Sequence, residues 1–261
     1  MSTVFYRRKP LVVTSAKQSD LTDGWVVIEG DVMSVYTNEE FERLFDKVEL
    51  QADMVPGGPD TDIFGFDYSW CKDEFGRRLI NELLGIEMAS IDNNIDGNSW
   101  MFKPYPLSTF GRLVGAIEQD MEEGFDANVK FLEVGCGIGA KLVLVSKLFG
   151  FQVTGFDYNL QYCNDACELL HHWECQNWVV ENADALSVTA LEYYQASDVI
   201  YLNRPFVHLE QQGELEHLVL ERMRPGAYVI LANYAAEPSV LAQSGWREIA
   251  RDKLAIVLQK P

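Results

Sequence analysis

A glycine-rich loop offers the clearest chemistry in the chain, at residues 135–139 with the sequence GCGIG. It follows an apolar stretch that contains Glu133, and the helix-forming sequence AKL comes directly after it. Glycines at alternate positions let the backbone turn tightly and approach a ligand closely, because no Cβ is in the way. The amides at the start of the following helix carry partial positive charge toward whatever lies above the loop. The spacing therefore predicts a binding loop for a ligand with an anionic group.

Two acidic residues follow the loop at positions where a nucleoside would need them. Asp157 closes the next predicted strand, about twenty residues after the glycines, where its carboxylate can accept hydrogen bonds from both hydroxyls of a ribose. Asp184 follows the third predicted strand and can reach the exocyclic amine of an adenine; the alternative is a surface turn residue. NAD and S-adenosylmethionine both present a ribose to such an acid. The glycine spacing lacks the G-x-x-G ending of the dinucleotide fingerprint, which favours S-adenosylmethionine over NAD.

These residues need a frame of strands and helices, and from about residue 129 short apolar stretches alternate with helical ones. Such alternation is typical of a parallel sheet with right-handed crossovers. Only residues 251–253 separate the last two stretches, so these form a hairpin and one strand lies antiparallel. We expect an α/β fold, a mostly parallel seven-stranded sheet with helices on both faces. The predicted strands are 129–134, 152–156, 178–182, 199–203, 227–232, 246–250 and 254–259, and the predicted helices are 140–149, 160–173, 190–194 and 209–223.

The sequence before this frame divides into two parts. Residues 1–50 contain apolar runs at 11–13 and 25–28, turn signals and a helical pattern over 37–50, which indicate a small α+β, β-rich module. Residues 51–100 are interpreted as a linker and a helical segment, with an amphipathic pattern over 72–86. A helix over 106–123 is expected near the start of the main domain, 101–261. Residues 51–128 are the candidate lid or substrate surface.

Over about residues 100–261 the chain resembles the class I S-adenosylmethionine-dependent methyltransferases. The matching motifs are FLEVGCGIG at 131–139, GFDYN at 155–159, NADA at 182–185, DVIYLN at 198–203 and RPGA at 224–227. They occur in the family's order and spacing, and the terminal hairpin is also a family feature. The resemblance implies a Rossmann-like fold, S-adenosyl-L-methionine as cofactor and methyl transfer as the activity.

The resemblance also implies cofactor contacts, which gather at strand ends and just before the first helix of the domain. They are Tyr105 or Lys103, closing over the cofactor; Glu133 and Gly135 at its methionine end; Cys136, Gly137 and Gly139 in the loop; Asp157 on the ribose; Tyr158 on the adenine; Asp184 on the adenine amine; and Asn203 next to the reacting methyl group.

Asn203, Arg204 and His208 are the catalytic candidates. Amino-group methyltransferases that act on DNA carry Asn or Asp followed by two prolines and an aromatic residue, whereas here Arg204 interrupts the motif as Asn-Arg-Pro-Phe. This departure disfavours a nucleobase acceptor, and the alternative for Asn203 is a role in shape alone. His208 is a candidate general base; the alternative is an exposed histidine at a helix start.

A metal cluster is the alternative reading of Cys163, Cys167 and His171, which recur every four residues of one predicted helix. Buried cysteines on a helix that packs against a sheet produce the same pattern. No metal site is expected.

The charge balance restricts the classes of molecule that we expect the protein to bind. The chain has 40 acidic against 21 basic side chains, a net charge of −19, which repels nucleic-acid backbones and anionic membrane surfaces. We therefore expect a small-molecule, glycan or protein acceptor rather than a nucleic acid. No apolar stretch has a membrane-spanning length, the N-terminus lacks a signal-peptide pattern, and the five cysteines form no C-x-x-C pair. These features predict a reduced, cytoplasmic protein.

A second resemblance covers about the first fifty residues. The segments 6–13, 23–27 and 41–45 look like a short β-rich protein common in bacteriophages. This implies a phage origin and location in the host cytoplasm. It also provides an alternative function, a catalytically inactive Rossmann-like module with a structural or assembly role in a phage particle, and a homodimer is a further expectation.

Overall fold

Two units make up the chain in a computed structural model, Met1–Ser69 and Trp70–Pro261. The structure describes residues 3–8, 24–29, 32–37, 67–71, 73–89, 105–121, 128–206, 208–235 and 245–261. The first unit contains an antiparallel sheet in the order β1 (Thr3–Arg8), β2 (Gly24–Glu29) and β3 (Val32–Thr37). Strand β2 contains the predicted run 25–28, whereas β1 and β3 were not predicted. The run 11–13 and the helix expected beyond Thr37 lie outside the described residues.

The second unit contains a seven-stranded sheet in the order β6-β5-β4-β7-β8-β10-β9, which confirms the predicted fold class. The five strands β6-β5-β4-β7-β8 pair in parallel, and β10 pairs antiparallel with both β8 and β9. The chain runs outward from β4 to β5 and β6, then crosses back to β7 on the other side of β4, and such a switch point opens a crevice at the carboxyl ends of the strands. The bounds are β4 Lys130–Val134, β5 Gln152–Asp157, β6 Trp178–Asn182, β7 Val199–Asn203, β8 Tyr228–Ala232, β9 Arg247–Arg251 and β10 Ala255–Gln259.

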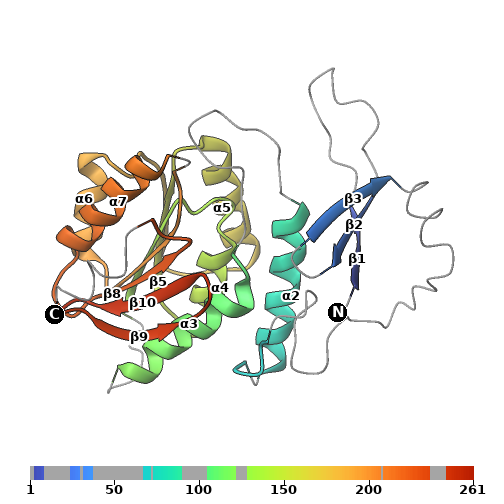
Figure 1. The fold of residues 1–261 in the computed structure, drawn as a ribbon, viewed down its shortest axis with the longest axis horizontal. Helices are drawn as coiled ribbons and strands as arrows, with labels where there is room; N and C mark the ends of the chain where they lie inside the picture. The colour runs from blue at the N-terminus through green and yellow to red at the C-terminus, as the bar shows by residue number, and fades with distance from the viewer. Residues whose placement is uncertain are drawn as a thin grey trace. The chain divides into compact units, whose positions relative to one another are not determined.

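Helices cover both faces of this sheet (Figure 1). Helix α4 contacts α2, α3 and α5 on one face, and α6 contacts α7 on the other. The helical segment expected within residues 51–100 therefore belongs to the second unit, where α2 packs against α4. The bounds are α2 Glu74–Ala89, α3 Leu107–Asp120, α4 Ala140–Phe149, α5 Leu160–His172, α6 Val188–Ala196 and α7 Leu209–Arg222.

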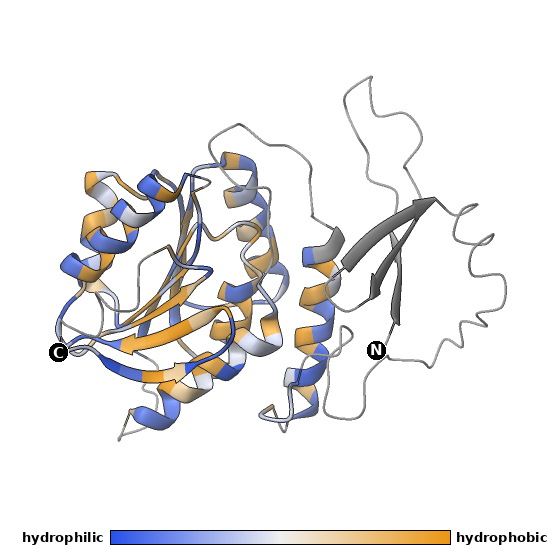
Figure 2. Cartoon of the chain, viewed as in Figure 1, coloured by the Kyte–Doolittle hydropathy of each residue, from blue (hydrophilic) through white to orange (hydrophobic). Residues whose placement is uncertain are grey.

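The core lies along the central strands of the second unit. All five residues of β8 and the first four of β7 are buried. The apolar residues of β8 are orange in Figure 2. Parallel strands covered on both faces need such continuous apolar runs, which explains why their bounds could be predicted within a residue or two. None of the described helices combines the length and hydrophobicity that crossing a membrane requires.

Candidate functional site

The glycine loop between β4 and α4 forms the tight turn that its sequence predicts. Gly135, Gly137 and Gly139 have φ values of 73°, 52° and 79°, in the left-handed region that side chains with a Cβ avoid. The amides of Gly135 and Cys136 both donate to the carbonyl of Phe156, at 2.9 and 3.0 Å. The loop is thus anchored on β5, and Gly139 caps α4 without a side-chain hydrogen bond, which leaves the first-turn amides of the helix for a ligand.

Two of these glycines also make room for neighbouring segments. A Cβ on Gly139 would lie 2.8 Å from the Cβ of Ala166 in α5, and one on Gly135 would lie 3.0 Å from the Cβ of Pro205. Pro205 follows β7, so the segment after β7 passes directly beside the loop. The sheet therefore brings the ends of β4, β5 and β7 together at one edge, as the site requires.

Asp157 ends β5 with its carboxylate beside the loop. Its Oδ2 accepts from the amide of Gly137 and its Oδ1 from the amide of Asn159, both at 2.9 Å. Burial raises the pKa of Asp157, and the amides of Asn159 and Gly137 oppose that shift. Asn159 caps α5 by accepting from Gln161, so Asp157 does not serve as the helix cap. Each carboxylate oxygen can accept a second hydrogen bond, which leaves capacity for two ligand hydroxyls.

The residues predicted to contact an adenine follow the ends of β5 and β6. The Asn182 amide donates to the carbonyls of Tyr158 and Asp157 at 2.7 and 3.0 Å, which ties the ends of β5 and β6 together. The Tyr158 side chain is 70% exposed at this edge. Asp184 is exposed, and its Oδ1 accepts from the amide of Leu186 at 2.9 Å, a turn contact of the kind the alternative interpretation describes. Adenine contacts for Tyr158 and Asp184 stay predictions.

The three catalytic candidates lie at and beyond the end of β7. Asn203 Oδ1 accepts from the side-chain amide of Asn233 at 2.8 Å. Arg204 and Asn233 have φ values of 44° and 50°, a strained conformation for residues with a Cβ and one that clusters at functional sites. His208 is exposed at the N-cap of α7, where it makes no side-chain capping bond. Asn203 and Arg204 are thus adjacent to Pro205 and the loop, whereas the position of His208 is that of an exposed helix-start residue.

Beneath the loop lies a group of buried charged side chains. Glu133 is the fourth residue of β4, and its burial raises its pKa to about 8. Lys141, in the first turn of α4, donates to Glu87 Oε1 of α2 at 3.0 Å, and all three side chains are buried. Tyr201 pairs with Glu133 across β4 and β7, and its ring centroid is 6.0 Å from Lys141 Nζ.

Tyr105 occupies the interior rather than the surface. Its side chain is buried, its hydroxyl donates to the carboxylate of Asp252, and its ring centroid lies 6.5 Å from that of Tyr201. Closure of Tyr105 over the cofactor stays a prediction, and Lys103 lies outside the described residues.

Comparison with known proteins adds two kinds of similarity, although no family model matches the chain. The chain is 28% identical over 103 residues to 2-methyl-6-phytyl-1,4-hydroquinone methyltransferase of Synechocystis sp., which covers 40% of this chain and 31% of that protein. It is 28% identical over 113 residues to phosphoethanolamine N-methyltransferase 1 of Triticum aestivum, covering 43% and 22%. The chain thus matches less than a third of the length of these curated relatives.

Among solved structures, an RNA methyltransferase from Salinibacter ruber in complex with S-adenosyl-L-homocysteine has a TM-score of 0.46 at 13% identity, covering 60% of this chain and 92% of that one. A T. thermophilus 16S rRNA methyltransferase in complex with AdoMet and guanosine has a TM-score of 0.46 at 20% identity, covering 61% and 44%. We identify the fold from three features: the strand order, the antiparallel terminal pair and the sequence similarity to curated methyltransferases. The second unit has a class I methyltransferase fold.

Cys163 of this methyltransferase fold packs beside the candidate site. Cys163 is buried, and its Sγ lies 3.4 Å from the carbonyl oxygen of Asp157 and 3.3 Å from that of Glu181. Burial raises the pKa of its thiol. Within the described part of the chain, no three histidine, cysteine or acidic side chains gather as a metal site. Cys163 therefore helps to hold the ends of β5 and β6, next to Asp157.

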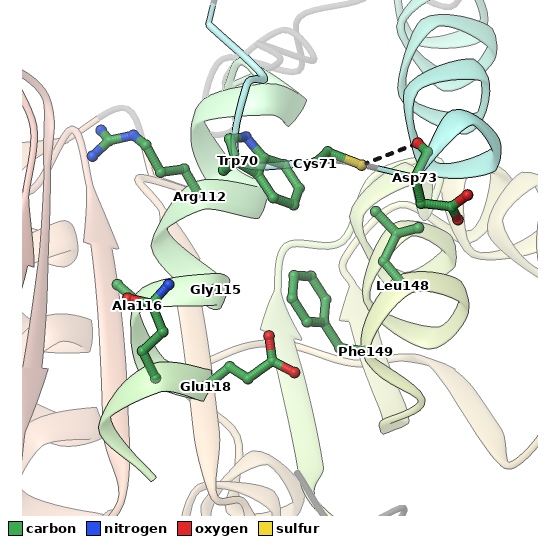
Figure 3. Close-up of a pocket in the computed structure, with 10 residues that line it drawn as sticks. Trp70, Cys71, Asp73, Arg112, Gly115, Ala116, Glu118, Leu148 and Phe149 are labelled. Carbon is green, nitrogen blue, oxygen red and sulfur yellow. Dashed lines mark hydrogen bonds between the residues drawn. The ribbon is translucent and has the colours of Figure 1, made fainter. Parts of the chain in front are cut away.

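Figure 3 shows a pocket of the methyltransferase fold. Its walls include Trp70, Glu118 and Phe149, and the Trp70 and Phe149 rings are nearly parallel with centroids 6.4 Å apart. Phe149 ends α4, whereas the loop precedes the first residue of that helix. Ten helical residues span about 15 Å, so the pocket and the glycine loop lie at opposite ends of α4.

Sequence reasoning missed Glu87 and Lys141. A signal for Glu87 was present, because it follows Leu83 by four residues and therefore continues the apolar face of α2. Lys141 is a charged residue in a first turn that is otherwise buried and apolar. Neither pattern identifies the partner, because 54 residues separate the two side chains.

Proposed function

We propose that this protein binds S-adenosylmethionine through the glycine loop and Asp157 and transfers its methyl group to an acceptor. The observation that carries the proposal is the Asp157 carboxylate, fixed beside the loop by the Gly137 amide and retaining capacity for a pair of ribose hydroxyls. The similarity of the chain to curated methyltransferases supports it. The residues of this site suit S-adenosylmethionine better than NAD.

Glu133 favours that choice of cofactor. Its side chain is 3% exposed, and its Oε2 has no hydrogen-bond partner among the described residues. Once it has lost its proton, a buried carboxylate in this position repels a pyrophosphate and attracts a cation. The methionine end of S-adenosylmethionine carries an ammonium and a sulfonium, whereas the corresponding part of NAD is the pyrophosphate.

The reaction needs little proton transfer by the protein. When bound, the cofactor supplies a methyl group that is already activated on a sulfonium. The loop and Asp157 hold the nucleoside, while Asn203 and Arg204, beside the loop at the end of β7, align the acceptor for in-line attack and exclude water. A general base is needed only for an acceptor that must lose a proton, and His208 is the candidate for that role.

The acceptor class is a further part of the proposal. The net charge of −19 disfavours a nucleic acid, and the names of both curated relatives describe small acceptors. We therefore favour a small molecule, with glycans and proteins as alternatives. The phage resemblance of residues 1–50 and the associated assembly role stay predictions.

Isothermal titration with S-adenosylmethionine, S-adenosylhomocysteine and NAD tests the cofactor. We expect the first two to bind, and Asp157→Ala to weaken their binding by about tenfold or more, because it removes two hydrogen bonds to a charged acceptor. Asp165→Ala on α5 is the matched control, since that acid pairs with Gln161 on the same helix. Binding of NAD alone, or unchanged affinity in Asp157→Ala, would overturn the proposal. Incubation of cell lysate with labelled cofactor then identifies the class of acceptor.

A further inference from the structure

The buried charges below the loop do not balance. Glu87, Lys141 and Glu133 are 1%, 4% and 3% exposed. If all three ionise, they hold two negative charges and one positive charge. Burying an uncompensated charge is costly, so such an excess requires either a bound proton or a cationic partner.

Lys141 is the single cation of this group, and it pairs with Glu87, which is not part of the glycine motif. Lys141 Nζ donates to Glu87 Oε1 at 3.0 Å and forms an ion pair with it. In the described part of the chain, Glu133 Oε2, Glu87 Oε2 and the Tyr201 hydroxyl lack hydrogen-bond partners. Buried polar atoms in this state are rare and call for an explanation. A ligand that donates to Glu133 would provide one.

We propose that Glu87 is a positioning residue for the cofactor site: it holds the Lys141 ammonium, so that Glu133 remains available to the cationic methionine end of the cofactor. The proposal rests on the proposed function. Without Glu87, Glu133 would be the nearest acid to Lys141, and the two would neutralise each other in a buried environment where opposite charges attract strongly. Through its ion pair with Lys141, helix α2 thus contributes to the cofactor site.

The electrostatic surroundings of Glu133 support this division of roles. Burial raises the pKa of Glu133 to about 8, Lys141 lowers it, and Glu87 and Asp157 raise it further. Glu133 therefore carries a proton at neutral pH, which must leave before the side chain can accept from an ammonium. The groups that face it are Glu87 from α2, Lys141 from α4, Asp157 from β5, Tyr201 from β7 and Cys136 from the loop.

The pH dependence of cofactor affinity tests the proposal. In the wild type, affinity for S-adenosylhomocysteine should rise about tenfold per pH unit and level off near pH 8, where Glu133 loses its proton. In Glu87→Gln, Lys141 is free to pair with Glu133. The midpoint of the pH dependence of affinity should therefore fall by about one pH unit or more, and the plateau affinity should drop. Glu87→Asp retains the charge and should restore the wild-type midpoint.

Two further variants make the result specific. Glu82→Gln is the matched control on α2, because Glu82 is exposed and pairs with Arg78, and its midpoint should not move. The double variant Glu87→Leu/Lys141→Met removes the ion pair without leaving a lone buried charge, so it tests the proposal even where Glu87→Gln does not fold. Its midpoint should rise above that of the wild type, because Glu133 loses its cation.

The outcomes separate the two proposals. A wild type that binds no S-adenosylhomocysteine overturns the proposed function. A wild type that binds, with a Glu87→Gln midpoint equal to its own, leaves the function standing and overturns the positioning role. A uniform loss of affinity at every pH in Glu87→Gln also overturns that role, because it indicates a structural effect alone.

Discussion

Replacement of Gly139 by alanine should destabilise the second unit through two separable effects. Its φ of 79° is left-handed, which costs alanine about 1–2 kcal/mol. The new Cβ would also lie 2.8 Å from the Ala166 Cβ and 3.1 Å from its Cα, whereas carbon atoms pack at about 3.5–4.0 Å. Helix α5 must therefore shift, and such overpacking costs about 1–3 kcal/mol. The expected total loss of unfolding free energy is about 2–5 kcal/mol.

Gly150→Ala separates these effects, because Gly150 caps the other end of α4. Its φ is 72°, and no atom lies within 4 Å of its ideal Cβ, so only the backbone cost of about 1–2 kcal/mol applies. Urea unfolding followed by far-UV circular dichroism measures both variants, since the described helices all lie in the second unit. In an Ala166→Gly background the loss from Gly139→Ala should shrink. Equal losses at Gly139 and Gly150, or no coupling to Ala166, would refute the packing argument.

Two further predictions concern stability. The folded state raises the pKa of Glu133 from 4.5 to about 8, so this residue's contribution to stability is present below pH 4.5 and is lost as the pH rises toward 8. Urea unfolding across that window should show a smaller decline for Glu133→Gln than for the wild type, and parallel declines would contradict the assignment. Exposed Glu174 has a φ of 50°, so Glu174→Gly should raise the unfolding free energy by about 1 kcal/mol. Glu168→Gly, in the interior of α5, should lower it by about the same amount, and scanning calorimetry distinguishes the two signs.

The sequence allowed the second sheet to be predicted closely because its strands are short apolar runs between helices. Strands β6 and β7 match their predicted ranges 178–182 and 199–203. Helix α6 is longer than its predicted range 190–194 because Ser187 accepts from the amide of Ala190 and starts the helix at Val188. In the first unit, β1 and β3 were not predicted, because their sequences TVFYRR and VMSVYT mix polar and apolar residues.

In the candidate site, too, some features could be predicted from the sequence and others could not. The positions of the glycines and Asp157 could be predicted, because a motif fixes residues relative to strand ends that share one edge of a parallel sheet. Contacts between distant elements could not. Periodicity places Glu87 on the buried face of α2 but does not indicate that Lys141 lies opposite, and the alternation of glycines does not indicate that Gly139 leaves room for Ala166.

Helix α2 now has a different role from the one its sequence position suggested. Residues 51–128 were expected to supply a lid or substrate surface, but Leu79, Ile80 and Leu83 of α2 are fully buried within the second unit. A lid is drawn from segments that bury little, because it must open at low cost in free energy. Opening α2 would expose this apolar face and also separate Glu87 from Lys141, leaving a buried cation without its acid. Within residues 51–128, α2 is therefore part of the scaffold beneath the cofactor loop.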